Sequence, residues 1–330
     1  MTDAPWQRSL TEGDDSLFAG RPAPADEATY ATLTYEVTGR IARITFNRPE
    51  QGNAITPDTP LDLAHAVERA DLDPRVHVMV VSGRGSGFCG GYDLDMFAEH
   101  DMAQAQSDQP CEGTVLDPVA QARNHDPTRT WDPMVDYAMM SRSTRGFASL
   151  LHANKPTVAK LHGFCIAGGT DIALHADQII VAADTKIGYP PTRVWGIPAA
   201  GMWAHRLGDQ RAKRLLLTGD TITGAEAVEW GLAIEAPDAA DLDERTEILL
   251  ERIARMPLNQ LIMTKLALNS VLLAQGVATS AMVSTVFDGV ARHTREGHDF
   301  VARAATAGFR QAVRDRDEPF GDAGRTVFRG

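Results

Sequence analysis

The chain is short of cysteine, of positive charge and of long apolar runs. Its three cysteines, Cys89, Cys111 and Cys165, lack the spacing of metal ligands and cannot all pair, so we expect reduced thiols in a cytoplasmic protein. The formal net charge of −12 argues against a general nucleic-acid-binding surface. Because no run of about 18 apolar residues occurs and the N-terminus has no apolar signal-peptide core, we expect neither a membrane span nor a secretory leader.

Nucleotide-binding and zinc-binding motifs are also missing. The glycine-rich stretch GRGSGFCGG has no P-loop lysine, and neither a dinucleotide fingerprint nor a zinc motif occurs. We therefore predict no metal site and no separately bound cofactor. What is present is the composition of an ordinary folded protein, with 43% hydrophobic and 23% charged residues in 330, which is enough to bury a sizeable core in one or two domains.

Residue patterns divide the chain into three parts. Residues 1–28 are polar and contain proline, which predicts a disordered or surface-draped tail. Residues 29–256 alternate between strand and helix patterns, apart from an irregular insertion at about 98–130 that is rich in Asp, Pro and Gly. Such a long irregular segment is typical of a functional lid or of disorder. In the last part, 257–330, the periodicity predicts consecutive amphipathic helices at 262–274, 277–292 and 297–313.

Short elements are predicted within the middle part. Alternating residues on both sides of Gly39-Arg40 predict a β-hairpin, and the almost wholly apolar stretch VHVMVVSG predicts a buried strand. Further strands are expected at 157–161, 178–182 and 186–188, and helices at 60–70, at 135–151 and from Gly168 onward.

Two short glycine clusters carry the most information about function. GFCGGYDL places Gly90 and Gly91 before Tyr92, and KPTVAKLHGFCIAGGTD places Gly168 and Gly169 between a strand-like and a helix-like run. Glycine lets the backbone approach a ligand closely, and a helix N-terminus points free N–H groups at whatever binds there. Two such N–H groups would stabilise the negative oxygen that develops on a reacting acyl group.

These clusters resemble motifs of the crotonase, or enoyl-CoA hydratase/isomerase, superfamily, and the resemblance covers about residues 33–256. Four segments follow in the order of the family: ITFNRPEQGNAIT, VMVVSGRGSGFCGGYDL, KPTVAKLHGFCIAGGTDIALHADQIIVAADTKIGYP and LLLTGDTITGAEAVEWGLA. The resemblance implies an α/β fold, a crotonase (ClpP-like) spiral core of repeated ββα units. It also implies a C-terminal helical region that builds a homotrimer or a dimer of trimers. The implied substrate is an acyl-CoA thioester, so coenzyme A enters as part of the substrate.

The resemblance also implies roles for individual residues. The backbone N–H groups of Tyr92 and Gly168 would form the oxyanion hole. Asp171, where hydratases of the family usually carry a glutamate, would act on water, although an aspartate near a helix start can also serve as a cap. The CoA moiety would lie against a further set of residues: Arg48, Asn53, Ala54, Cys89 and Gly90.

One part of the family pattern is missing from the sequence. Pro191 stands where hydratases of the family carry a second catalytic glutamate, and Ala199 stands near the position of a carboxylate in dienoyl-CoA isomerases. Hydration needs one group to take a proton and one to give it, so a single carboxylate would have to do both. Tyr189 could donate a proton, but burial is the commoner role of a large aromatic residue. Arg193 is more typical of a salt-bridge partner than of a catalyst.

We therefore expect an enzyme that polarises a thioester carbonyl, with enoyl-CoA hydration as the leading reaction. Asp171 would activate water and return a proton to the α-carbon of the enolate. Two alternatives stay open. The same groups could direct water at the thioester or at a C–C bond, which gives a hydrolase, and the replacement by Pro191 is also compatible with a non-catalytic acyl-CoA-binding subunit.

Overall fold

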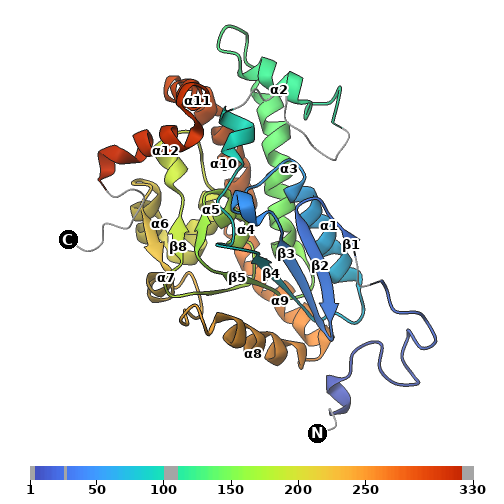
Figure 1. The fold of residues 1–330 in the computed structure, drawn as a ribbon. Coiled ribbons are helices and arrows are strands. Elements are labelled where there is room, and N and C mark those ends of the chain that lie inside the picture. Colours follow the sequence, from blue (N-terminus) through green and yellow to red (C-terminus); the bar gives the residue numbers. More distant parts are fainter. Residues whose placement is uncertain (1–3, 26–27, 100–110, 322–330) are drawn as a thin grey trace.

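A six-stranded sheet forms the centre of the fold in a computed structural model that describes residues 4–25, 28–99 and 111–321 (Figure 1). In spatial order its strands are β1 (Ala28–Thr29), β2 (Leu33–Thr38), β3 (Ile41–Phe46), β4 (Val78–Gly83), β5 (Thr157–Leu161) and β7 (Gln178–Val181). The first three strands pair antiparallel, and β3, β4, β5 and β7 pair parallel. The predicted hairpin is confirmed, because Thr38 pairs with Ile41 across the two-residue turn.

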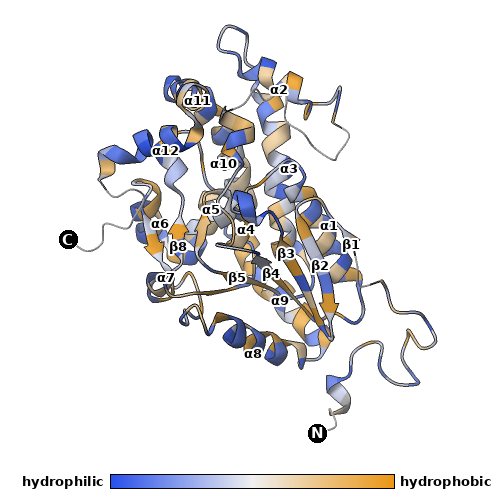
Figure 2. Cartoon of the chain, in the orientation of Figure 1, coloured by the Kyte–Doolittle hydropathy of each residue, from blue (hydrophilic) through white to orange (hydrophobic). Residues whose placement is uncertain are grey.

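The buried strand β4 separates two layers of core. Met79 and Val81 belong to the main hydrophobic core, which includes residues of α1 (Thr59–Leu72) and α3 (Pro133–His152). Val78 and Val80 belong to a second core formed with α8 (Leu242–Ala254). Since helices cover both faces of this strand, its sequence is apolar throughout rather than alternating. Figure 2 shows the mixed hydropathy along α8, which carries both hydrophilic and hydrophobic residues.

A second, three-stranded sheet positions the glycine clusters. It contains β6 (Phe164–Ile166), β8 (Lys186–Gly188) and β9 (Thr221–Thr223), with β6 parallel and β9 antiparallel to the central β8. An isolated bridge joins Cys89 to Cys165, so the segment after β4 runs beside β6. The chain then enters α4 (Gly168–Ala173), which is the helix that the second glycine cluster predicts.

Shorter elements complete the part of the chain up to residue 256. They are α5 (Ala200–Leu207), α6 (Asp209–Leu216), α7 (Gly224–Trp230) and the single-turn segments η1 (Pro5–Gln7), η2 (Pro49–Gln51), η3 (Asp95–Glu99) and η5 (Pro190–Arg193). Part of the predicted N-terminal tail lies against the hairpin, because Arg40 donates to the Gln7 carbonyl at 2.7 Å and pairs with Glu12. Residues 1–3 and 26–27 of that tail lie outside the described residues.

The insertion at about 98–130 was expected to be irregular, and this expectation is wrong for one stretch. Residues 118–125 form α2 (Pro118–His125). The helix starts because the Asp117 side chain accepts a hydrogen bond from the Val119 N–H and Pro118 occupies the first helical position, a start signal that favours a helix. Residues 100–110 of the insertion lie outside the described residues.

Four helices and one short turn follow residue 256 in the described chain. They are α9 (Leu258–Ala274), α10 (Val277–Arg292), α11 (Arg295–Ala307), α12 (Phe309–Asp317) and η6 (Glu318–Phe320). The single helix predicted at 297–313 is wrong, because Gly308, with φ of +83°, ends α11 and starts α12. Residues 322–330 of the predicted C-terminal region lie outside the described residues. No single helix among the described residues meets the length and apolar composition of a membrane span, although α9 and α10 do so together as one bent pair.

Candidate active site

Two neighbouring cavities lie where the two sheets meet the C-terminal helices. The larger has a volume of about 740 Å³ and the smaller about 30 Å³. Four residues line both cavities: Tyr92, Met140, Tyr189 and Asp288. The larger cavity has room for a sizeable organic group, and the smaller one has room for a water molecule.

Both predicted oxyanion-hole segments border these cavities and touch each other. Gly91 has φ of +96°, and a Cβ atom there would lie 2.7 Å from the Cβ of Ala167, so only glycine fits. A Cβ on Gly168 would lie 2.6 Å from Ile55 Cδ1 and 3.0 Å from Tyr92 Cε2. Within the described part of the chain, neither the Tyr92 N–H nor the Gly168 N–H donates a hydrogen bond.

Asp171 is a buried carboxylate on the first turn of α4, and only 8% of the residue is exposed. Its Oδ1 accepts a hydrogen bond from the Ala199 N–H at 2.9 Å, so the residue stabilises a neighbouring loop rather than the end of its own helix. Burial, helped by the charge of Asp288, raises the pKa of Asp171 to about 7, against the opposing Ala199 hydrogen bond. Asp171 lines the small cavity but not the large one. It can therefore hold or release a proton near neutral pH.

Asp288 on α10 is a second buried carboxylate at this place, also 8% exposed, and no motif in the sequence selects it. Its Oδ1 accepts from the Ile197 N–H at 3.1 Å, and its Oδ2 lies 3.6 Å from the Arg292 guanidinium. Burial raises the pKa of Asp288, whereas Arg292 lowers it. Its position in VFDGVAR looks like that of any polar residue in an amphipathic helix, so only the fold reveals it.

The position at which the resemblance predicts a second glutamate faces the large cavity. Pro191, within η5, lines that cavity and offers no group that can exchange a proton. Tyr189 beside it is buried, and its hydroxyl donates to the Ile197 carbonyl at 3.4 Å. Thr192 Oγ1 donates to the Tyr189 carbonyl at 3.1 Å, so its hydroxyl serves the local turn.

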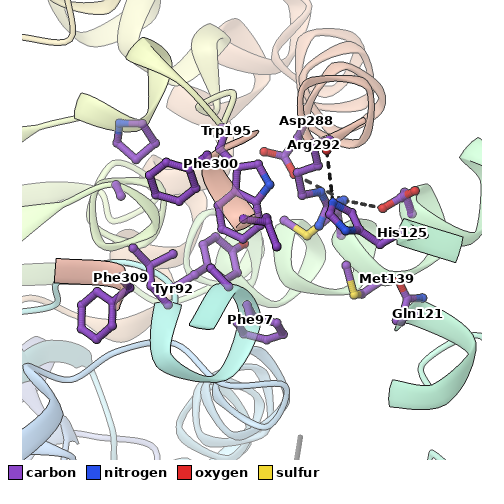
Figure 3. Close-up of a pocket in the computed structure, with 18 of the residues that line it drawn as sticks. Tyr92, Phe97, Gln121, His125, Met139, Trp195, Asp288, Arg292, Phe300 and Phe309 are labelled. Carbon is purple, nitrogen blue, oxygen red and sulfur yellow. Dashed lines mark hydrogen bonds and ion pairs between the residues drawn. The ribbon is translucent and has the colours of Figure 1, made fainter. Parts of the chain in front are cut away.

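The walls of the large cavity come mainly from segments outside the sheets. Trp195, with φ of +71°, stacks on Phe300 of α11 at a ring-centroid distance of 5.5 Å. Figure 3 shows these rings with Tyr92 on one side of the cavity and Asp288 with Arg292 on another. The insertion contributes several residues of α2 to the lining: Pro118, Gln121, Ala122 and His125. In Figure 1, α2, α11 and α12 accordingly gather at the end of the molecule away from α8.

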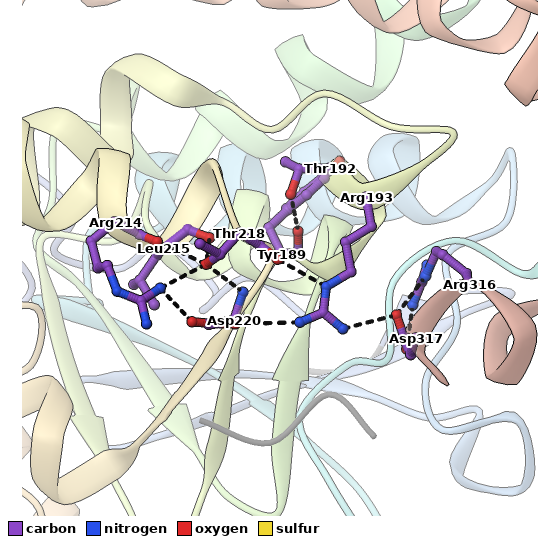
Figure 4. Close-up of polar contacts among 9 residues, drawn as sticks. All are labelled: Tyr189, Thr192, Arg193, Arg214, Leu215, Thr218, Asp220, Arg316 and Asp317. Atoms are coloured by element: carbon purple, nitrogen blue, oxygen red, sulfur yellow. Dashed lines mark hydrogen bonds and ion pairs between the residues drawn. The ribbon is translucent and has the colours of Figure 1, made fainter. Parts of the chain in front are cut away.

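Arg193 serves as the structural ion-pair partner that the sequence suggested. Its side chain is 2% exposed, and it pairs with Asp220 at 3.3 Å and with Asp317 at 3.1 Å. Its Nε also donates to the Thr218 carbonyl at 2.9 Å (Figure 4). The guanidinium therefore ties η5 to α12 and to the start of β9, and it does not line either cavity.

Replacing Arg193 with methionine is expected to destabilise the protein by about 1.5–3 kcal/mol, because two buried aspartates each lose one charged partner. Each keeps a second one, since Asp220 also pairs with Arg214 and Asp317 with Arg316. Urea unfolding would measure this loss. The matched control is Arg245→Met, since Arg245 pairs with Glu235 at the surface with 46% of its side chain exposed. This control is expected to cost about 1 kcal/mol or less. Equal losses in the two variants would contradict the structural role of Arg193.

Three of the residues expected near CoA lie together in the loop after β3. Arg48 pairs with Asp93 at 3.0 Å and donates to the Ala54 carbonyl at 2.6 Å. Asn53 has φ of +54°, accepts from the Arg48 N–H at 3.0 Å and donates to the Gly87 carbonyl at 3.0 Å. These bonds hold the two loops side by side. The phosphate contact of Arg48 stays a prediction, and its internal partners favour a structural role.

Cys89 and Gly90 complete this expected set. The Cys89 carbonyl accepts from the Ile166 N–H at 3.0 Å, and burial raises the pKa of its thiol to about 12, so the thiol stays protonated. Gly90 lines the large cavity, and its N–H donates to the Gly52 carbonyl at 3.0 Å. In the described chain all three cysteines are free, and no group of three or more His, Cys, Asp or Glu residues could hold a metal ion.

The fold and the paired glycine turns define an acyl-thioester enzyme of the crotonase type. The chain belongs to the enoyl-CoA hydratase/isomerase family, whose model matches residues 36–121 and 134–307. A solved enoyl-CoA hydratase from Mycobacterium smegmatis is 68% identical, with a TM-score of 0.85 over 92% of this chain and 100% of that one. An enoyl-CoA hydratase/isomerase from Xanthobacter autotrophicus Py2 is 25% identical, with a TM-score of 0.74 over 88% of this chain and 99% of that one. The mevalonyl-coenzyme A hydratase SIDH of Beauveria bassiana is 29% identical over 57% of this chain and 60% of that protein.

Proposed function

We propose that this protein hydrates enoyl-CoA thioesters. The observation that carries the proposal is that Tyr92 and Gly168, whose backbone N–H groups donate to no acceptor among the described residues, lie in touching segments beside a buried carboxylate and a water-sized cavity. Two N–H donors aimed at a thioester oxygen stabilise the enolate that forms when a nucleophile adds to the β-carbon. Asp171, with a pKa of about 7, is the acid/base group of this reaction.

The larger cavity suits the acyl part of the substrate. Its volume of about 740 Å³ and its lining of aromatic and aliphatic side chains, among them Phe97, Phe300 and Phe309, favour a bulky apolar acyl group. The CoA portion would lie along the loops that carry Asn53, Ala54, Cys89 and Gly90. Because CoA arrives with the substrate, the proposed reaction uses no other cofactor. The free thiols support the proposed cytoplasmic location.

We also propose assembly into trimers or pairs of trimers through α9 and α10. These helices expose an unusual number of large apolar side chains: Met263, Leu266, Leu268, Val271, Leu273, Met282, Val283, Val286, Phe287 and Val290. Many exposed apolar side chains on two consecutive helices favour a protein–protein interface. Light scattering of the purified protein tests the assembly, and a monomer at micromolar concentration would contradict it.

Turnover in ¹⁸O-labelled water tests the proposed reaction. The probes are crotonyl-CoA, trans-2-decenoyl-CoA and cinnamoyl-CoA, with products read by mass spectrometry. We expect label on the β-carbon of an intact CoA ester for at least one probe. Label in a free acid would mean hydrolysis instead, and binding of all three esters without label would indicate a non-catalytic acyl-CoA-binding subunit.

A further inference from the structure

We propose that Asp288 of α10 is the second acid/base group of the reaction and acts on the attacking water, while Asp171 protonates the α-carbon. Asp288 would thereby supply the group that Pro191 cannot. This inference rests on the proposed hydration, because it assigns the proton transfers of that reaction. Its support is the placement of the two carboxylates around one small cavity.

A single short loop holds both carboxylates. The Ala199 N–H donates to Asp171 Oδ1 at 2.9 Å, and the Ile197 N–H donates to Asp288 Oδ1 at 3.1 Å. Since the donors are two residues apart, the loop brings the acid from α4 and the acid from α10 to the same place. Both line the cavity of about 30 Å³, which is large enough for a water molecule in contact with them.

Asp288 also borders the larger cavity, and Asp171 does not. Two other carboxylates line that cavity, but their oxygens have several local partners. Asp136 accepts from Trp131 Nε1 at 2.6 Å and pairs with Arg292 at 2.9 Å, and Asp126 accepts twice from Thr128. Asp288 is therefore the carboxylate that can reach a water molecule positioned beside the acyl group.

The two acids differ in the charges that surround them. Asp288 faces Arg292 of its own helix, which favours the ionised form of Asp288 and opposes the effect of burial on its pKa. Asp171 has no guanidinium at hydrogen-bonding distance among the described residues, and the negative charge of Asp288 helps to raise its pKa to about 7. The other titratable groups that face the pair are Tyr92, Tyr189, His175, Asp136 and the buried thiols of Cys89 and Cys165. We therefore assign the base to Asp288, which borders the acyl cavity and faces Arg292, and the acid to Asp171.

The proton transfers then balance over one turnover. The water oxygen forms a bond to the β-carbon while one water proton passes to the Asp288 carboxylate. The electrons of the C=C bond move onto the thioester carbonyl, whose oxygen the two N–H groups stabilise. As the enolate collapses, the Asp171 carboxyl gives its proton to the α-carbon through a water molecule in the small cavity, because Asp171 lines that cavity and not the larger one. Transfer of a proton from Asp288 to Asp171 through the small cavity restores the starting state, so the net change is the addition of one water.

Asp288→Asn tests the assignment in the full-length protein. We expect kcat on the hydrated probe ester to fall by about 10²–10⁴-fold, while the Kd for butyryl-CoA changes only a few-fold. Asp288→Glu should recover part of kcat, because it restores a carboxylate. The control is Asp62→Asn, since Asp62 is equally buried at 8% exposure, also has a raised pKa and lines neither cavity. Unchanged kcat in Asp288→Asn would overturn the assignment.

The dependence of kcat on pH in the unmodified enzyme distinguishes a mechanism with two acid/base carboxylates from a mechanism with Asp171 alone. If Asp171 is the acid, kcat falls as its proton is lost above about pH 7. If Asp171 alone activates water as a base, kcat rises through the same pH, and this result would also overturn the assignment.

Infrared titration supplies a readout that needs no turnover. The carbonyl band of a protonated buried carboxyl should persist to about pH 7 and vanish in Asp171→Asn. In Asp288→Asn it should titrate at a pH lower by about one unit, because removing a neighbouring negative charge favours ionisation.

Failure of all three probe esters would contradict the proposed hydration. The infrared band would still show whether the two acids interact. If the pH at which it titrates is the same in Asp288→Asn as in the parent, the proposed interaction between Asp171 and Asp288 is overturned.

Discussion

Asp171→Asn is expected to lower kcat by about 10²–10⁴-fold, the usual contribution of a positioned acid or base. Asparagine keeps an oxygen that can accept from the Ala199 N–H and has nearly the shape of the protonated acid. The change therefore removes the transferable proton while the loop stays in place. Steady-state kinetics on the hydrated probe, with calorimetric binding of butyryl-CoA, measure the two quantities.

The stability of the variant is the control for this experiment. Burial disfavours the ionised form of Asp171, so the neutral asparagine should leave the free energy of unfolding unchanged or slightly increased at neutral pH. Activity equal to that of the parent would remove Asp171 from the mechanism. A large loss of stability together with the loss of activity would point to a structural role.

Gly168→Ala is expected to lower kcat by roughly 10²–10³-fold, the cost of losing one oxyanion donor. The added Cβ would lie 2.6 Å from Ile55 Cδ1 and 3.0 Å from Tyr92 Cε2, distances at which the Ile55 side chain or the Tyr92 ring must move. We expect the displaced Tyr92 ring to shift its own residue, so that the two N–H groups no longer fit the thioester oxygen together. The binding of butyryl-CoA should weaken much less than kcat falls, because the oxygen carries its full negative charge only in the reaction.

Tyr92→Phe is the companion variant, because the proposed role of Tyr92 uses its backbone alone. The phenylalanine ring fills the same space against Gly168, so kcat should stay within a few-fold of the parent. A loss in Tyr92→Phe as large as that in Gly168→Ala would show that the hydroxyl takes part, and the assignment of the N–H group would have to be withdrawn.

Local signals in the sequence were sufficient for much of the fold. The hairpin at Gly39-Arg40 and the helix that starts at Gly168 are both where the pattern predicted them. The break at Gly308 was not predicted, because the apolar spacing continues through it and a lone glycine is compatible with a helix. The start of α2 was missed because the Asp117-Pro118 signal lies within a stretch of otherwise irregular composition.

The candidate site likewise contains residues that the sequence could predict and one that it could not. The spacing of Gly168 and Asp171 follows from a contiguous motif, so the sequence alone could suggest it. Asp288 lies more than a hundred residues further along the chain and meets Asp171 only through the loop at Ile197 and Ala199. No local pattern encodes such a contact, because it depends on how α10 packs over the core.

The division of labour around the large cavity has an evolutionary consequence. The candidate proton-transfer groups and oxyanion donors sit on the core and on α10, whereas much of the acyl wall comes from α2 and from Phe300 and Phe309 of the last two helices. Substitutions or length changes in those peripheral segments can reshape the space for the acyl group while the reacting atoms keep their geometry. Descendants of one ancestral gene can therefore acquire new acyl preferences while the groups that carry out the reaction stay the same.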